Sequence, residues 1–162
     1  MVIFDVDGVL SSPKFAMTEK GEVLTEFNVL DGLGIKLLRK SGLEIAVISG
    51  RKLASVKLRL EDLGVTTIYQ GIKDKLMPYE DLKQELQLCD AEVAMMGDDI
   101  PDLPILARCG LGIAPLNATQ LIKDTVDYVT FKSGGEGAVR EFCDLLMEAQ
   151  GTLNKQLKDF LK

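Results

Sequence analysis

The sequence predicts an α/β fold, a doubly wound parallel sheet covered by helices. Short apolar runs alternate with longer segments in which apolar residues recur at helical spacing, as in β-α units. The 162 residues are 46% hydrophobic, which suits one compact domain that buries about two thirds of its unfolded surface. We therefore expect a single domain over residues 1–162.

Six apolar runs are expected to form the strands of this sheet. They lie near residues 2–6, 44–49, 66–69, 92–97, 110–114 and 126–130. We expect crossover helices in three places: over residues 31–42, after the second strand and after the third strand. In these segments apolar side chains, such as Ile35 and Leu38, recur at helical spacing. Gly42 and Gly64 stand where helix C-caps belong. Further helices are expected after Pro101 and over residues 117–124 and 136–149.

Residues 12–29 depart from this pattern. The segments "KFAM" and "EVLTEFNV" flank "TEKG", whose glycine suits a tight turn, so we expect a β-hairpin inserted after the first strand. This short insertion leaves no room for a cap domain between the first two motifs. The amphipathic tail, residues 151–162, is compatible with a surface helix or with a mobile arm.

Composition excludes several classes of function. A net charge of −6 makes a nucleic-acid backbone an unfavourable general partner. The chain has no histidine, which excludes Ser-His-Asp and Cys-His triads, and its three cysteines are too widely spaced for a zinc site. The apolar start "MVIF" is too short for a signal peptide or a membrane span, so a cytoplasmic protein without membrane partners is expected.

Candidate functional residues follow the predicted strands. Asp5 and Asp7 end the first strand, Ser49, Gly50 and Arg51 the second, and Asp98 the fourth. Ligands of doubly wound sheets bind beyond the carboxyl ends of the strands. We therefore expect these side chains to meet at one edge.

Asp5 and Asp7 are two residues apart, so on an extended backbone both carboxylates face the same side, and Gly8 lets the chain turn away. Carboxylates this close repel one another and require a cation, a proton or water. Asp98, in "MGDDIPDLPIL", is the best third ligand for a hard, oxygen-preferring cation such as Mg²⁺. Asp99 and Asp102 are expected either to support this site or to cap the following helix.

Two further residues suit a phosphoryl group. Ser49, in "ISGRK", stands where a strand meets a helix, a junction that favours anions, although an ordinary N-cap is an alternative. Lys75 is expected on the same edge, with Lys73 the less suitable neighbour. Phosphoryl transfer requires a nucleophile, residues that bind the phosphoryl group, charge neutralisation and a group that transfers a proton. The candidate residues include a carboxylate, phosphate-binding side chains, a metal site and a second acid that suit these roles.

The motifs "DVDGV", "ISGR", a lysine and "GDDIPD", in this order, resemble the haloacid dehalogenase superfamily of aspartyl-phosphate phosphatases, in its capless subclass. "EFNVLDGLGIKLL" and "GGEGAVREFCDLL" are similar to the 3-deoxy-D-manno-octulosonate (KDO) 8-phosphate phosphatases, and this similarity covers nearly the whole chain. The resemblance implies hydrolysis of KDO 8-phosphate to KDO and phosphate in lipopolysaccharide biosynthesis.

The resemblance also implies roles for residues. Asp5 would attack phosphorus, and Asp7 would protonate the leaving oxygen and then activate water. Asp5, Asp98 and the backbone carbonyl of Asp7 would hold Mg²⁺, and Ser49 and Lys75 would grip the phosphoryl group. Further substrate contacts would come from Asn28, Val29, Leu30, Asp31, Gly32, Lys36, Gly50, Arg51 and Arg59. A homotetramer, in which hairpins and neighbouring subunits complete each pocket, is implied as well.

Alternatives remain at this stage. Phosphatases of sialic- or KDN-type sugar phosphates resemble this chain but carry glutamate where Arg51 stands. Ser12 replaces a common aspartate of the family and Glu136 a common arginine, and relatives have a longer leader, which suggests a trimmed N-terminus. A receiver domain would place its lysine late in the chain, after the last acids. A non-catalytic assembly module would not need Asp5, Asp7, Asp98 and Lys75.

Overall fold

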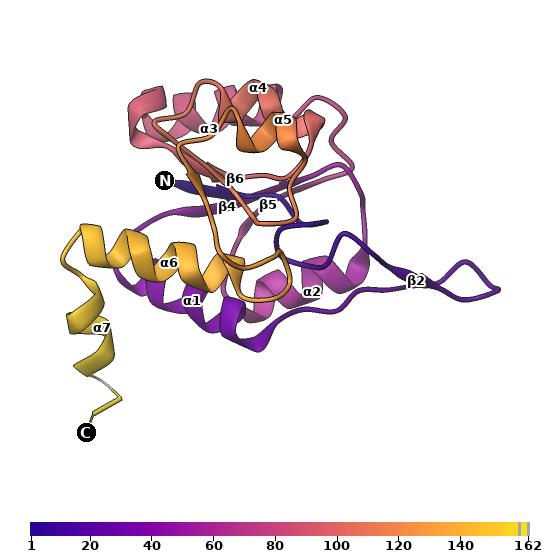
Figure 1. Cartoon of the computed structure of the whole chain (residues 1–162), viewed down its shortest axis with the longest axis horizontal. Helices are drawn as coiled ribbons and strands as arrows, with labels where there is room; N and C mark the ends of the chain where they lie inside the picture. Colours follow the sequence, from indigo (N-terminus) through magenta and orange to yellow (C-terminus); the bar gives the residue numbers. More distant parts are fainter. Residues whose placement is uncertain (159, 162) are drawn as a thin grey trace.

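A six-stranded parallel sheet forms the centre of the molecule (Figure 1). The computed structural model describes residues 1–158, 160 and 161, and within them the strand order is β5-β4-β1-β6-β7-β8. Each neighbouring pair is parallel, so the predicted doubly wound sheet is confirmed. The strands are β1 (Val2–Phe4), β4 (Ile45–Ser49), β5 (Thr67–Gln70), β6 (Ala94–Met96), β7 (Leu111–Ala114) and β8 (Tyr128–Val129).

Helices cover both faces of the sheet (Figure 1). One layer contains α1 (Val29–Lys40), α2 (Ala54–Asp62) and α6 (Ala138–Ala149), and the other α3 (Leu76–Leu86), α4 (Leu103–Leu106) and α5 (Gln120–Lys123). Because successive strand residues point to opposite faces, Phe4 packs in the first core beside Phe142, while Ile3 packs in the second beside Tyr79. The sheet is therefore apolar on both faces.

The first strand is shorter than predicted, and its end places the first acid. The Asp5 N–H still donates to the Met96 carbonyl at 3.1 Å, as in the ladder. The Val6 carbonyl then accepts the N–H groups of Val9 and Ser11, which turns the chain out of the sheet. Asp5 is thus held by the sheet, whereas Asp7 lies in the turn beyond it.

Two helical regions differ from their predicted bounds. The first helix begins at Val29, before residue 31, because the Asn28 side chain accepts the Leu30 N–H at 2.8 Å and caps it. The helix expected after Pro101 forms as two short pieces, the 3₁₀ turn η2 (Ile100–Asp102) and α4. A second 3₁₀ turn, η1 (Asp90–Glu92), precedes β6.

The predicted hairpin consists of β2 (Ala16–Met17) and β3 (Val23–Leu24), which are antiparallel and project from the body (Figure 1). In the tail, α7 (Leu153–Lys158) supports the helical alternative, and residues 159 and 162 of that prediction lie outside the described residues. Among the helices that the structure describes, none has the length and apolar character to cross a membrane. The single-domain interpretation stays a prediction.

Candidate active site

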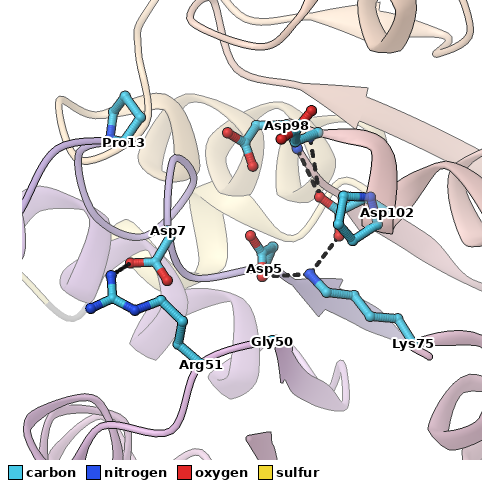
Figure 2. Close-up of a pocket in the computed structure, with 10 residues that line it drawn as sticks. Asp5, Asp7, Pro13, Gly50, Arg51, Lys75, Asp98 and Asp102 are labelled. Atoms are coloured by element: carbon cyan, nitrogen blue, oxygen red, sulfur yellow. Dashed lines mark hydrogen bonds and ion pairs between the residues drawn. The ribbon is translucent and has the colours of Figure 1, made fainter. Parts of the chain in front are cut away.

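A pocket of about 280 Å³ opens where the central strands end, in the crevice between the loops that follow them (Figure 2). The loops after β1, β4, β5 and β6 each contribute polar groups, as the rule for doubly wound sheets requires. Its lining residues are Asp5, Asp7, Pro13, Gly50, Arg51, Lys75, Asp98, Asp99, Pro101 and Asp102. Residues far apart in the sequence thus meet here.

Lys75 lies between two carboxylates at the base of the pocket (Figure 2). Its Nζ donates to Asp5 Oδ1 at 2.6 Å and to Asp102 Oδ1 at 2.7 Å, and the lysine side chain is only 4% exposed. It stands immediately before α3, so the helix backbone fixes its position. Lys73, by contrast, is exposed, which supports the choice of Lys75.

Burial and crowding change the acidity of this cluster. Desolvation, reinforced by the Asp102 charge, raises the pKa of Asp5 to about 7. Desolvation and the neighbouring charges of Asp5 and Asp102 raise the pKa of Asp98 to about 8. For Lys75, burial disfavours the ammonium, but the two carboxylates outweigh it and the pKa lies above its usual value. The raised pKa values of Asp5 and Asp98 show that the cluster contains more carboxyl groups than the charge of Lys75 can stabilise in ionised form.

The donor set suits a hard divalent cation. Asp5, Asp98 and Asp102 each offer a carboxylate oxygen, and these oxygens all lie within 4.8 Å of one another. Asp102 is already engaged, because Oδ1 accepts from Lys75 and Oδ2 accepts the Asp98 N–H at 3.0 Å. Asp5 and Asp98 therefore carry the charge that a cation would neutralise, and oxygen donors are those that Mg²⁺ prefers. The expected supporting role of Asp102 agrees with this geometry.

Gly8 allows the turn after Asp7 to pass between two other segments. Its φ of +85° is a left-handed conformation, and a Cβ there would lie 2.0 Å from Asp98 Oδ2. Gly134 packs against the same turn, because a Cβ at residue 134 would lie 1.8 Å from the Gly8 carbonyl oxygen. Both glycines are required by close approach, and together they set the Asp98 carboxylate against the turn.

Asn117 is a residue of this site that the sequence reasoning missed. Its Nδ2 donates to the Gly8 carbonyl at 3.0 Å, and its Oδ1 accepts the Gly134 N–H at 2.6 Å. Two residues later, the Thr119 N–H donates to the Asp98 carbonyl at 3.1 Å. The loop after β7 thus supports the turn after β1 and the backbone at Asp98 from outside the pocket lining, and the strand-end rule applied to β7 would have found it.

Asp7 and Arg51 lie across the pocket from Asp102 (Figure 2). Arg51 Nη1 donates to Asp7 Oδ1 at 3.1 Å, and about a third of each side chain is exposed. Ser49 is buried, and its hydroxyl oxygen accepts the Arg51 N–H at 3.3 Å. Ser49 lies outside the set that lines the pocket, whereas its neighbour Gly50 belongs to it.

The other predicted substrate contacts lie elsewhere in this chain. Asn28, Asp31, Gly32 and Arg59 line a narrow crevice between α1 and α2. Asp31 is buried and accepts the N–H groups of Gly137 and Arg140, and burial raises its pKa. Val29 and Leu30 are exposed on α1, and Lys36 pairs with Asp62 at 3.6 Å. Their contact with substrate stays a prediction.

Known proteins are similar to this chain in sequence and in fold. Residues 67–142 match the family model of haloacid dehalogenase-like hydrolases. The 3-deoxy-D-manno-octulosonate 8-phosphate phosphatase KdsC of Escherichia coli strain K12 is 45% identical over 155 residues, which are 96% of this chain and 82% of that protein. The chain belongs to the 3-deoxy-D-manno-octulosonate 8-phosphate phosphatase family. As a member of this family, it is a phosphoric monoester hydrolase.

Solved structures of this phosphatase family agree in fold. The Moraxella catarrhalis 3-deoxy-D-manno-octulosonate 8-phosphate phosphatase, in complex with magnesium ion, phosphate ion and KDO, superposes with a TM-score of 0.95 at 38% identity, covering 98% of this chain and 91% of that one. The cobalt-bound deoxy-D-mannose-octulosonate 8-phosphate phosphatase of Haemophilus influenzae gives 0.91 at 37%, covering 99% and 95%.

Proposed function

We propose that the chain hydrolyses 3-deoxy-D-manno-octulosonate 8-phosphate to KDO and phosphate with Mg²⁺, through an aspartyl-phosphate on Asp5. The convergence of Asp5, Asp7, Lys75 and Asp98 on one pocket is the observation that carries this proposal. The Moraxella catarrhalis relative, which holds magnesium, phosphate and KDO, supports the choice of metal and substrate. Asp5, Asp98 and the backbone carbonyl of Asp7 would hold the cation.

In the first step, an Asp5 carboxylate oxygen attacks phosphorus, and the bond from phosphorus to the sugar oxygen breaks. The departing oxygen keeps the electron pair and takes a proton from Asp7. Lys75 holds Asp5 at 2.6 Å and so orients its carboxylate. The bound cation would neutralise charge on the phosphoryl oxygens.

In the second step, water attacks phosphorus, and the bond between Asp5 and phosphorus breaks to release phosphate. Asp7 takes the proton of that water, which restores both carboxyl groups to their starting states. Ser49 and Lys75 would bind phosphoryl oxygens in both steps. The Ser49 hydroxyl oxygen accepts the Arg51 N–H at 3.3 Å, which leaves its own O–H free to donate to a phosphoryl oxygen.

Arg51 lines the pocket and is proposed to bind the carboxylate of the sugar acid, since a guanidinium matches a carboxylate with two parallel hydrogen bonds. Residues 28–32, Lys36 and Arg59 would contact the rest of the sugar, as the family resemblance implies. We include in the same proposal a homotetramer whose subunits complete each other's pockets, a cytoplasmic location and a role in lipopolysaccharide biosynthesis.

A panel of sugar phosphates, assayed for released phosphate with Mg²⁺ and with EDTA, tests the proposal. KDO 8-phosphate should be the best substrate, and EDTA should abolish its hydrolysis. A preference for a nine-carbon sialic- or KDN-type phosphate would replace the proposed substrate with the related one. Absence of phosphatase activity on every ester would favour a non-catalytic assembly module.

A further inference from the structure

The base of the hairpin contacts the proposed carboxylate-binding residue. The guanidinium carbon of Arg51 lies 4.3 Å from the centroid of the Phe15 ring, over its face. Pro13, two residues earlier, lines the pocket itself. The family resemblance implies that hairpins and neighbouring subunits complete each pocket, and within one chain Phe15 already contacts Arg51.

The two contacts of Arg51 use different parts of its side chain. Asp7 accepts one N–H of the guanidinium at 3.1 Å, and the guanidinium carbon lies over the Phe15 ring, 4.3 Å from its centroid. A ring beneath a cation attracts it through the quadrupole of the π-system and takes up none of its N–H donors. The remaining N–H groups, in the plane of the guanidinium, stay available to an anion.

A carboxylate binds a guanidinium in that same plane, through two parallel hydrogen bonds. The orientation of the plane therefore decides whether the carboxylate of a ligand in the pocket can be bound in this way. The Arg51 side chain is 33% exposed, so without further contacts it could adopt many rotamers. The contact with the Phe15 ring restricts that freedom without using a hydrogen-bond acceptor.

We propose that Phe15 is a positioning residue that holds Arg51 for carboxylate-bearing phosphate esters, and thereby contributes to substrate specificity. The inference rests on the proposed function, in which Arg51 binds the carboxylate of the sugar acid. It assigns the base of the hairpin to this chain's own pocket. The hairpin turn remains available to a neighbouring subunit.

Kinetics of Phe15→Leu test the role, because leucine keeps an apolar side chain but removes the ring. For KDO 8-phosphate, KM should rise about two- to fivefold with kcat unchanged, the size expected for an exposed cation–π contact. For 4-nitrophenyl phosphate, which has no carboxylate, kcat/KM should stay at the wild-type value. Phe15→Trp should restore the KM for KDO 8-phosphate.

A matched control is Phe131→Leu, the same substitution at an exposed phenylalanine outside the pocket lining, which should change neither substrate. In an Arg51→Ala background, Phe15→Leu should have no further effect on KM. Equal changes for both substrates, an unchanged KM for KDO 8-phosphate, or a full effect without Arg51 would overturn the inference. A shift in oligomeric state on light scattering, with unchanged kinetics, would also overturn it and assign Phe15 to an interface.

Fluorescence tests the contact without turnover. The chain contains no tryptophan, so Phe15→Trp introduces a single tryptophan, which can be excited selectively over the three tyrosines. Its emission should change when Arg51→Ala is added and when KDO is titrated, and insensitivity to both would overturn the inference.

Failure of the proposed function can be distinguished from failure of this inference. If the wild type hydrolyses 4-nitrophenyl phosphate but not KDO 8-phosphate, the proposed substrate is wrong, and its carboxylate is not the ligand of Arg51. Wild-type activity on KDO 8-phosphate with an unaffected Phe15→Leu variant would overturn this inference alone.

Discussion

Two lysines, one just before α3 and one in its last turn, each lie between two carboxylates, yet their surroundings differ. Lys75, just before the helix, contacts Asp5 and Asp102, and all three side chains are at most 9% exposed. Lys83, in the last turn, contacts Glu80 and Asp90, which are 45% and 36% exposed. The same ion-pair chemistry is thus present once inside the pocket and once at the surface.

The acidities of the partner carboxylates differ accordingly. Burial raises the pKa of Asp5 to about 7, although Lys75 is bound to it. Hydrogen bonds from Lys83 and Tyr79 lower the pKa of Asp90, because water still solvates its charge. Lys83 therefore stabilises the ionised form of its partner Asp90, whereas Lys75 does not outweigh the burial of Asp5. A further cation near Asp5 would favour its ionised form.

The largest expected effect comes from replacing the buried acid. Asp5→Asn should reduce phosphate release at least about a thousandfold, because an amide cannot serve as the nucleophile. Its oxygen can still accept from Lys75, so the melting temperature should change little. Asp90→Asn, the matched change in the surface cluster, should leave kcat at the wild-type value. Wild-type turnover by Asp5→Asn would refute the assigned nucleophile.

Replacing Lys75 or Lys83 compares how much each lysine contributes to the free energy of unfolding. Lys75→Met leaves Asp5 and Asp102 buried without their shared cation, which should cost about 3–5 kcal/mol of unfolding free energy. Lys83→Met removes a solvated contact and should change stability little. Urea denaturation in EDTA measures both variants without help from a metal. Equal losses would contradict the distinction between the two clusters.

Gly8→Ala tests how closely the turn and Asp98 fit. A methyl group would lie 2.0 Å from Asp98 Oδ2, so the carboxylate must move, and the Mg²⁺ concentration for half-maximal activity should rise about tenfold or more. Gly21→Ala is a matched control, since φ there is +78° and nothing lies within 4 Å. Both variants share the backbone strain, but only the first should change the Mg²⁺ dependence.

The smallest effect concerns pH and the surface cluster. The lowered pKa of Asp90 means that its contribution to stability is complete above the unfolded value of about 4. That contribution is lost as the pH falls through the lower folded pKa. The difference in melting temperature between wild type and Lys83→Met should therefore shrink below about pH 4. A difference that grows in acid would contradict this sign.

Much of the pocket could be predicted because strand ends are visible in a sequence. Asp5 and Asp98 follow apolar runs directly, and parallel strands bring their carboxyl ends to one edge. Lys75 could be distinguished from Lys73 only by its expected place on that edge. The family and its hydrolase class, expected from ordered motifs, are confirmed by relatives that match nearly the whole chain.

Other features depend on tertiary contacts that no local pattern encodes. Asn117 joins Gly8 to Gly134, residues 109 and 17 positions away, through its side chain alone. The contact between Phe15 and Arg51 joins the base of the hairpin to the loop after β4, and no local pattern predicts it. The start of α1 at Val29 differs from the prediction because Asn28, which caps the helix, was assigned to the hairpin segment "EVLTEFNV" and to the substrate contacts.

The central place of β1 has a consequence for biosynthesis. The strand that presents Asp5 pairs with residues 45–47 and 94–96, and the turn after it rests on Gly134. Asp5, the proposed nucleophile, comes earlier in the chain than the strands and the glycine that hold its surroundings, so these surroundings are complete only after Gly134 has been translated. Among the residues that line the pocket, Asp5 is therefore translated first, yet the folded environment that raises its pKa forms late.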